Sequence, residues 1–227
     1  MERLPRILLT ICLFILEIIY SLCVALGLKY IGIDINAMPL KTQTMYLIGI
    51  DISFMIIIFL LYRKDILNNL SNYFKNFLKC FSTGFKCWMI GILIMIISNI
   101  VLSFYFPSGA SNEQAVQTIL KQMPQYMIFS AVIYAPFVEE LIFRKSIRDI
   151  VKNDYLYILV SGFAFGLAHT LTSSSSLEFL YIIPYGALGC CFAYSYVKTK
   201  NIFVPITFHM IHNAIVVIIS LSKFMGA

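Results

Sequence analysis

The chain has 227 residues, of which 60% are hydrophobic and only 12% are charged, and its formal net charge is +6. A soluble globular domain is about half apolar and about a quarter charged, so this composition excludes an ordinary soluble protein and indicates a polytopic membrane protein. No basic cluster with interleaved aromatic residues occurs, so we expect no nucleic-acid partner. The six cysteines show no CxxC spacing and are interpreted as small buried hydrophobic residues.

Seven apolar runs approach or exceed the roughly 20 residues that cross about 30 Å of hydrocarbon. They fall near residues 7–28, 44–62, 85–106, 127–144, 155–171, 177–197 and 202–221. The first run is too long for the hydrophobic region of a signal peptide and is interpreted as a retained helix. No linker, low-complexity tract or internal repeat divides the chain. We therefore predict one membrane domain over residues 1–227, an all-α polytopic bundle of about seven transmembrane segments.

The basic residues are distributed unevenly between the two sides of these segments. Of the 17 Lys and Arg residues, 13 lie before the first segment or in the second, fourth and sixth connections. Positively charged connections stay in the cytoplasm, so this asymmetry predicts a cytoplasmic N-terminus and an external C-terminus.

Two connections are themselves predicted to be helical. Residues 65–85 alternate Leu, Phe and Tyr with Asn and Lys, which indicates a basic amphipathic helix on the cytoplasmic membrane surface. Residues 111–125 read as a short external helix with Ser111 as its N-cap. This second helix could shield or gate a cavity, or could only connect two segments. Glu17 and Asp51, the acids inside the first two runs, are expected to face the protein interior in structural roles.

The most informative stretch is PFVEELIFR, from Pro136 to Arg144, at the end of the fourth apolar run. At about 100° per residue, Glu139 and Glu140 point in different directions from a helix, whereas Glu140 and Arg144 share a face. Glu140 and Arg144 can therefore neutralise each other and leave the carboxylate of Glu139 free. Ionisable groups at membrane depth cost on the order of several kcal/mol each and mark functional sites.

The three histidines all lie in apolar runs of the C-terminal third. His169 follows Phe165 by four residues, and His209 precedes Asn213 by four, so each pair shares a helix face. The sequence assigns no role to His212, which lies three residues after His209. Polar side chains on apolar helices converge in the interior of a bundle, where they form binding or catalytic sites.

Two chemistries fit these groups. Glu139 and His169 could bind and deprotonate a water, while His209 and Asn213 donate hydrogen bonds to the oxyanion of an attacked amide. Alternatively, Glu139, His169 and His209 could ligate Zn²⁺, which lowers the pKa of bound water toward ~7. The sequence lacks both HExxH and a GxSG serine site. A cofactor is thus either absent or zinc, and both readings stay open.

Three motifs in order, EExxxR from Glu139, FxxxH ending at His169 and HxxxN from His209, resemble the CPBP or Abi family. This family comprises type-2 CAAX prenyl endopeptidases and bacterial bacteriocin-processing and immunity proteins. The resemblance covers residues 127–216, which we expect to be the catalytic core.

The resemblance implies a role for each motif residue. It makes Glu139 the water-activating glutamate with His169 as its partner, and it places His209 and Asn213 at the oxyanion. The supporting pair that it implies consists of Glu140 and Arg144.

The expected function is an intramembrane endopeptidase of the glutamate or metallo type, in the lipid bilayer of a bacterial cell membrane. It would hydrolyse a peptide bond of a membrane-associated peptide or protein in a polar cavity open to the cytoplasmic side. The alternative is a non-catalytic membrane-interaction or bacteriocin-immunity protein on the same fold. A proton-relaying transporter is disfavoured because the chain shows no duplicated halves.

The predicted segment ends leave one geometric difficulty. They place Glu139 and His209 about 10 Å from the cytoplasmic ends of their segments, but His169 about 20 Å in. Convergence then requires the 155–171 segment to tilt, or to begin outside the membrane.

Overall fold

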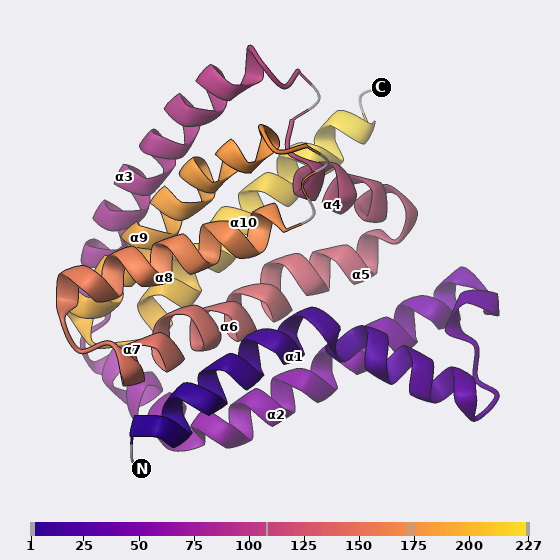
Figure 1. Ribbon diagram of the computed structural model, residues 1–227, viewed down its shortest axis with the longest axis horizontal. Coiled ribbons are helices and arrows are strands. Elements are labelled where there is room, and N and C mark those ends of the chain that lie inside the picture. Colours follow the sequence, from indigo (N-terminus) through magenta and orange to yellow (C-terminus); the bar gives the residue numbers. More distant parts are fainter. Residues whose placement is uncertain (1–2, 108, 172, 174, 226–227) are drawn as a thin grey trace.

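The computed structural model describes residues 3–107, 109–171, 173 and 175–225, so the ends of the predicted 1–227 domain lie outside the described residues. All regular structure in the described part is helical (Figure 1). Three long helices form the N-terminal half: α1 (Arg3–Tyr30), α2 (Leu40–Lys75) and α3 (Phe77–Ser103). A single 3₁₀ turn, Ile35–Ala37, lies between the first two. The predicted all-α class is confirmed.

The C-terminal half begins with the short helix α4 (Ser111–Gln122) and a long, uninterrupted helical rod. The rod consists of α5 (Pro124–Phe129), a π-helical turn (Ser130–Tyr134), α6 (Ala135–Glu140), a second π-helical turn (Leu141–Ser146) and α7 (Ile147–Ile150). Three further helices complete the bundle: α8 (Asp154–Thr170), α9 (Ile182–Thr199), preceded by a 3₁₀ turn at Glu178–Tyr181, and α10 (Phe203–Met225).

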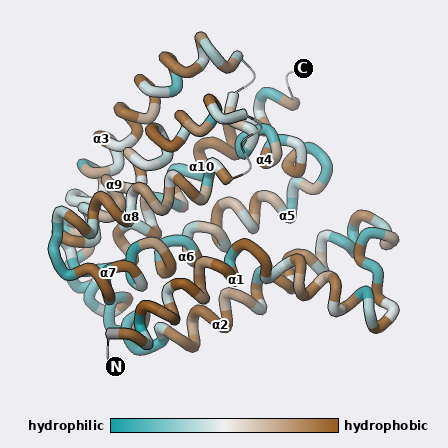
Figure 2. Tube along the Cα trace, in the orientation of Figure 1, coloured by the Kyte–Doolittle hydropathy of each residue, from teal (hydrophilic) through white to brown (hydrophobic). Residues whose placement is uncertain are grey.

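Each of the seven predicted apolar runs coincides with one of these helices or with the rod. Within the described residues, six helices are long and apolar enough to cross a membrane. The exception is α8, whose 17 residues correspond to a length of about 26 Å. Figure 2 shows apolar residues along the helices and polar residues concentrated at their ends. The described N- and C-terminal ends lie at opposite ends of the bundle (Figure 1); which end faces the cytoplasm stays a prediction.

The stretch 65–85 is helical, but it is not the separate surface helix that its pattern suggested. Residues up to Lys75 continue α2, and α3 starts at Phe77. The physical reason is that the apolar face of this stretch packs on the protein itself. Ile66 is buried in the main core, and Tyr73 is buried among residues of α3, α9 and α10.

The prediction that Ser111 is the N-cap of α4 is wrong by one residue, because Ala110 occupies that position. Its side chain offers no acceptor, and the buried carboxylate of Glu178 accepts a hydrogen bond from the Ser111 backbone N–H instead. A negative charge at a helix N-terminus is stabilised by the macrodipole and by the unpaired N–H groups there. A residue 67 positions away in sequence thus provides the cap.

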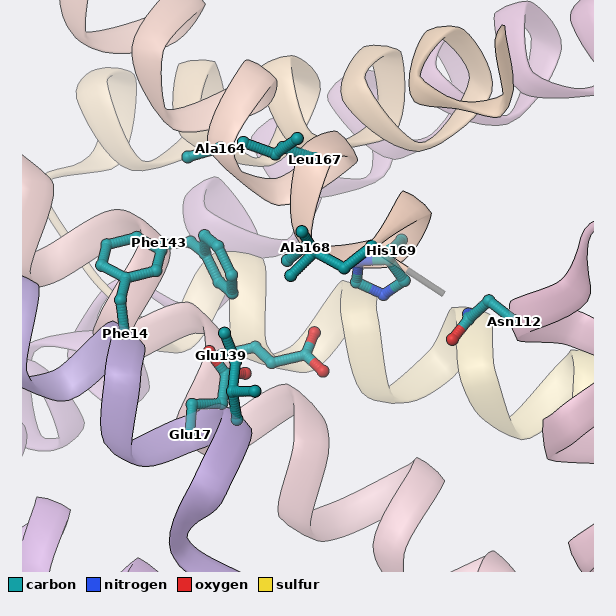
Figure 3. A pocket seen from close by; sticks show the side chains of 11 residues that line it. Phe14, Glu17, Asn112, Glu139, Phe143, Ala164, Leu167, Ala168 and His169 are labelled. Carbon is teal, nitrogen blue, oxygen red and sulfur yellow. The ribbon is translucent and has the colours of Figure 1, made fainter. Parts of the chain in front are cut away.

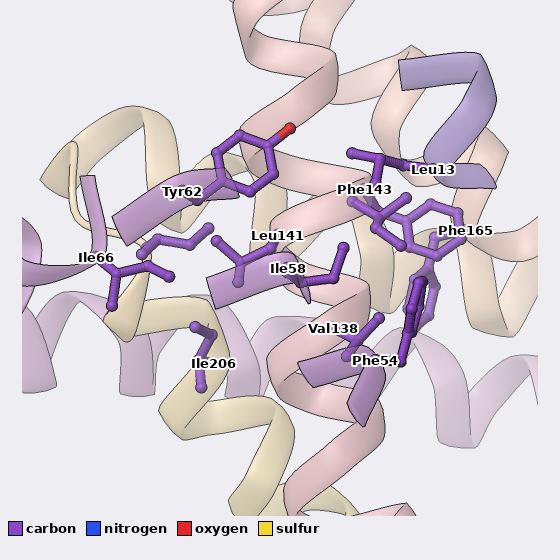
Figure 4. Packing of buried hydrophobic residues seen from close by; sticks show 12 residues of the cluster. Leu13, Phe54, Ile58, Tyr62, Ile66, Val138, Leu141, Phe143, Phe165 and Ile206 are labelled. Atoms are coloured by element: carbon purple, nitrogen blue, oxygen red, sulfur yellow. The ribbon is translucent and has the colours of Figure 1, made fainter. Parts of the chain in front are cut away.

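The main hydrophobic core lies where α1, α2, the rod, α8 and the start of α10 meet (Figure 4). Phe54 and Ile58 of α2 and Val138 and Leu141 of the rod have no exposed surface there. This packing fixes the rotation of the rod about its axis. It thereby determines that Glu140 is fully buried while Glu139 faces the cavities.

A close approach of two backbones positions α8 against α9. A Cβ atom on Gly166 would lie 2.8 Å from the carbonyl oxygen of Ile182, and one on Gly162 would lie 2.9 Å from the backbone nitrogen of Cys190. Small residues four apart let membrane helices pack with their backbones nearly in contact. These two glycines hold α8, and with it His169, against α9.

Candidate active site

The helix that carries Glu139 departs from α-helical geometry on both sides of that residue. In the turn before it, the Ala135 N–H donates to the carbonyl of Ser130, five residues back. Pro136, the next residue, has no N–H to donate. Single π-turns inside helices are uncommon and occur often at functional sites.

This local geometry explains the position of Asn213. The carbonyl of Ala131 would accept from Ala135 in an α-helix and from Pro136 in a continued π-helix, and neither donor is available. Asn213 Nδ2 donates to that carbonyl at 2.8 Å instead. One N–H of the Asn213 amide is therefore committed to the rod, and the second remains for another acceptor.

Glu140 and Arg144 form an ion pair with no exposed side-chain surface, as their spacing predicts. Arg144 Nε lies 2.9 Å from Glu140 Oε2, close enough for an ion pair although the angle is poor for a hydrogen bond. Arg144 Nη2 donates to Glu140 Oε1 at 3.3 Å, and Nη1 donates to the hydroxyl of Ser161 at 3.1 Å. The guanidinium also lies 4.7 Å from the ring centre of Phe165, a cation–π contact.

Glu140 reaches the next helix as well, because its Oε1 lies 2.9 Å from His209 Nδ1. A carboxylate only accepts, so Nδ1 carries the hydrogen. The other ring nitrogen, Nε2, faces Glu139, whose Oε2 is 3.9 Å away. Within the described residues this buried oxygen of Glu139 has no hydrogen-bond partner. It is therefore available to a water or a substrate.

A hydrogen bond from Nδ1 also orients the imidazole of His169. Its Nδ1 lies 2.9 Å from the carbonyl oxygen of Phe165, which can only accept, so Nδ1 carries the hydrogen and Nε2 has the lone pair. The imidazole packs between the rings of Phe165 and Tyr185, with centroid distances of 4.4 and 4.8 Å. The ring of Phe165 also contacts His209, at 5.7 Å. These aromatic contacts limit both imidazoles to narrow ranges of orientation.

Two cavities adjoin Glu139 and His169. The larger has a volume of about 450 Å³ and lies between α1 and α8 (Figure 3). The smaller, of about 250 Å³, is lined by Glu139, His169, His209 and Asn213 together. The structure thus brings the four predicted site residues around one cavity. The predicted external helix α4 adds Asn112 and Glu113 to that lining.

The convergence of His169 with the other groups follows in part from corrected helix ends. The fourth segment was predicted to end at residue 144, whereas the helical rod continues to Ile150. Eleven residues then separate Glu139 from that end, about 16 Å rather than 10 Å. His169 lies 15 residues from the start of α8, about 22 Å. The difference in depth between Glu139 and His169 is therefore smaller than the predicted segment ends indicated.

Sequence reasoning missed several residues of the site. Glu17 was expected to be structural, yet it lines the larger cavity beside Glu139 (Figure 3). Ser161 and Tyr185 were not predicted to belong to the site, because the local sequence around them does not indicate a contact between helices. A usable signal for Glu17 was its place on the face of α1 that also carries the buried Leu13.

The zinc alternative is not favoured by the positions of its proposed ligands, Glu139, His169 and His209. Among the residues that the structure describes, no three His, Cys, Asp or Glu side chains are grouped closely enough to hold a metal ion. A water that hydrogen-bonds to both atoms can bridge the 3.9 Å between His209 Nε2 and Glu139 Oε2. We therefore derive no step through a metal.

Comparison with known proteins supports the resemblance seen in the motifs. Residues 121–215 match the family model of the type II CAAX prenyl endopeptidase Rce1-like proteins. The chain is 33% identical over 115 residues to the "Putative membrane peptidase YdiL" of Bacillus subtilis, a match that covers 49% of this chain and 44% of the relative. It is 31% identical over 143 residues to the "Membrane-embedded CAAX protease MroQ" of Staphylococcus aureus, covering 59% and 55%.

The matches therefore span about half the length of these curated relatives. No solved structure matches the chain. Together with the six apolar helices, the membrane-peptidase relatives show that the chain is an integral membrane protein.

Proposed function

We propose, from the Rce1-like type II CAAX prenyl endopeptidase domain at residues 121–215, that this integral membrane protein is an intramembrane endopeptidase. The observation that carries the proposal is the buried Oε2 of Glu139, which has no hydrogen-bond partner among the described residues and lies 3.9 Å from His209 Nε2. A carboxylate in this position, with two imidazoles and an amide around the same cavity, has the composition of a water-activating site.

In the proposed reaction, Glu139 and His169 activate a water. The water donates one hydrogen to the Glu139 carboxylate and the other to the Nε2 lone pair of His169, which orients it. Glu139 takes its proton as the water oxygen attacks the carbonyl carbon of the scissile peptide bond. The carbonyl π electrons move to the oxygen and form a tetrahedral oxyanion.

Asn213 and His209 then donate hydrogen bonds to the oxyanion. The second N–H of the Asn213 amide is one donor. Because the Nδ1 hydrogen of His209 is committed to Glu140, Nε2 can donate only when the ring is an imidazolium. The buried Glu140 carboxylate stabilises that cation through the 2.9 Å contact. Glu139 finally passes its proton to the leaving nitrogen as the C–N bond breaks, which yields a carboxylic acid and an amine.

The second candidate is a non-catalytic interaction or immunity protein on the same fold. Burial of an ion pair such as Glu140–Arg144 is compatible with both functions, so this pair does not separate them. Glu139 does, because only a peptidase needs its carboxylate as a base, so removal of that carboxylate distinguishes the two functions.

The test compares cells that express the wild type or Glu139→Gln at matched membrane levels, by quantitative peptidomics. Glutamine keeps the shape of the side chain but removes the base, so we expect a defined set of peptide termini to disappear. Asp65→Asn is the control, since Asp65 is 51% exposed and lies outside both cavities. Identical termini in wild-type and Glu139→Gln cells, with both proteins folded, would show that the protein is not a peptidase and would favour the interaction role.

A further inference from the structure

We propose that the cavity between α1 and α8 binds a basic side chain of the substrate, with Glu17 as its acidic partner. This inference rests on the proposed peptidase function and names a substrate class for it: a membrane-associated polypeptide with Lys or Arg near the scissile bond.

The cavity is bounded by one face of each helix. Glu17 lies on the α1 side and Leu167 lies on the α8 side, and Glu139 of the rod lies beside Glu17 (Figure 3). The small side chain of Ala168 leaves space between the two helices. The volume of about 450 Å³ is in the range of known ligand sites.

The packing of α1 fixes Glu17 toward this cavity rather than toward lipid. One turn before it, the ring of Phe14 contacts Phe143 edge-on with centroids 4.9 Å apart. Three residues after it, the Tyr20 hydroxyl bonds the hydroxyl of Ser53 at 2.7 Å. Residues 14, 17 and 20 share a face of the helix, so both contacts hold Glu17 in the bundle interior.

Glu17 is unpaired in the part of the chain that the structure describes. Among the described residues, no hydrogen bond or ion pair involves its side chain, and no Lys or Arg lines the cavity. Arg144, the buried arginine of the rod, is committed to Glu140. A carboxylate at membrane depth is costly without a counter-charge, and a second carboxylate, Glu139, faces the same cavity. Two carboxylates in a low-dielectric space repel each other, so a cation bound between them would stabilise their charged forms.

Charge complementarity therefore favours a cationic occupant, and the lining of the cavity favours apolar residues on either side of it. Apart from Asn112 and the three titratable groups, the cavity is lined by apolar side chains, which suit the apolar neighbours of a membrane-embedded basic residue. Because Glu139 contributes to both cavities, a side chain bound at Glu17 lies within a few residues of the bond attacked by the water that Glu139 activates.

The test uses the full chain in lipid nanodiscs and synthetic Leu/Ala-rich peptides of about 20 residues, long enough to span the bilayer. Each peptide carries Lys, norleucine or Glu at one scanned position, and products are quantified by mass spectrometry. We expect the wild type to cleave at a fixed distance from Lys, with kcat/KM about tenfold above that for norleucine, the effect of one well-placed charge pair. Glu17→Gln should remove this preference, and Glu17→Lys should reverse it toward Glu.

Asp51→Asn is the matched control, because Asp51 is also an acid at membrane depth but lines neither cavity, so the Lys preference should persist. Glu139-dependent cleavage without a Lys preference would overturn this inference alone, and the wild-type comparison decides this even if a Glu17 variant misfolds. An equal loss of cleavage for all three peptides in Glu17→Gln would also overturn the inference. That result would point to a structural role of Glu17 or to a lipid amine bound there. No Glu139-dependent cleavage of any peptide would overturn the proposed function and this inference together.

Discussion

Asn213 Nδ2 donates a hydrogen bond to the carbonyl of Ala131 at 2.8 Å, and this bond replaces one that Pro136 cannot make. It joins α10 to the rod one helical turn from Pro136. Asn213 thus has a structural task as well as its proposed catalytic one, and the two tasks can be separated by mutation.

Asn213→Ala should lower the free energy of unfolding by about 1–2 kcal/mol, because it leaves the buried Ala131 carbonyl without a donor. In a Pro136→Ala background the restored backbone N–H can reach that carbonyl, so the further loss from Asn213→Ala should nearly vanish. The loss of peptidase activity should persist in both backgrounds, because the oxyanion donor is still missing. Denaturant titration and product quantification measure the two effects. An equal destabilisation in both backgrounds would refute the compensation by Asn213.

Glu140→Gln should destabilise the protein by about 3 kcal/mol, because it leaves Arg144 buried without its counter-charge. Asp149→Asn is the matched control. Lys145 and Asp149 have the same four-residue spacing, but the Asp149 side chain is 29% exposed, so this change should cost less than about 1 kcal/mol. The measurement is the unfolding free energy of each variant in the same detergent. Equal losses from the two substitutions would mean that burial of the Glu140 pair is not what makes it important.

Gly166→Ala should force α8 away from α9, because the new Cβ would lie 2.8 Å from the Ile182 carbonyl oxygen. We expect a loss of about 1–3 kcal/mol in stability and a larger fall in kcat than in KM, since His169 moves with α8. The control is Gly27→Ala in α1, where a Cβ meets nothing within 4 Å. That change should be neutral or stabilising by up to about 1 kcal/mol. Unchanged activity in Gly166→Ala would show that the close approach of α8 and α9 does not position the site.

Removal of divalent metal ions should leave peptidase activity intact, since the proposed general base is Glu139 and the described side chains form no ligand set for a metal. The measurement is the rate of peptide cleavage after dialysis against EDTA and 1,10-phenanthroline, compared with the rate in the untreated protein. A loss of activity that added Zn²⁺ restores would replace the proposed water activation by the metallo-type mechanism.

The helices of this fold could be predicted because each depends on a local property, the length of an apolar run. The pairing of Glu140 with Arg144 was also accessible, because a four-residue spacing within one helix determines it. The ends of the helices could not be predicted in the same way. The rod continues beyond residue 144 because Arg144 itself is buried by contacts with α8 and α9, and no pattern in the rod reports those contacts.

Contacts between distant segments account for the remaining differences. Glu178 caps α4 from 67 residues away, which no search near Ser111 could find. Glu17 lies in the half of the chain that carries no recognised motif, and only the arrangement of α1 against α8 places it beside Glu139. In the site, the residues of the three motifs were predicted from sequence, whereas the groups that orient them, such as Ser161 and Tyr185, were found only in three dimensions.

The short length of α8 has a consequence for the surrounding lipid. At about 26 Å it is shorter than the roughly 30 Å of hydrocarbon in a typical bilayer, and a bilayer responds to such a mismatch by thinning locally. Because α8 forms one wall of the larger cavity, we expect any such thinning to occur next to Glu139. Hydrolysis consumes one water for every bond cleaved, and a thinner barrier shortens the distance that water must travel. The short helix α8 therefore lies where a hydrolytic site is most easily supplied with water.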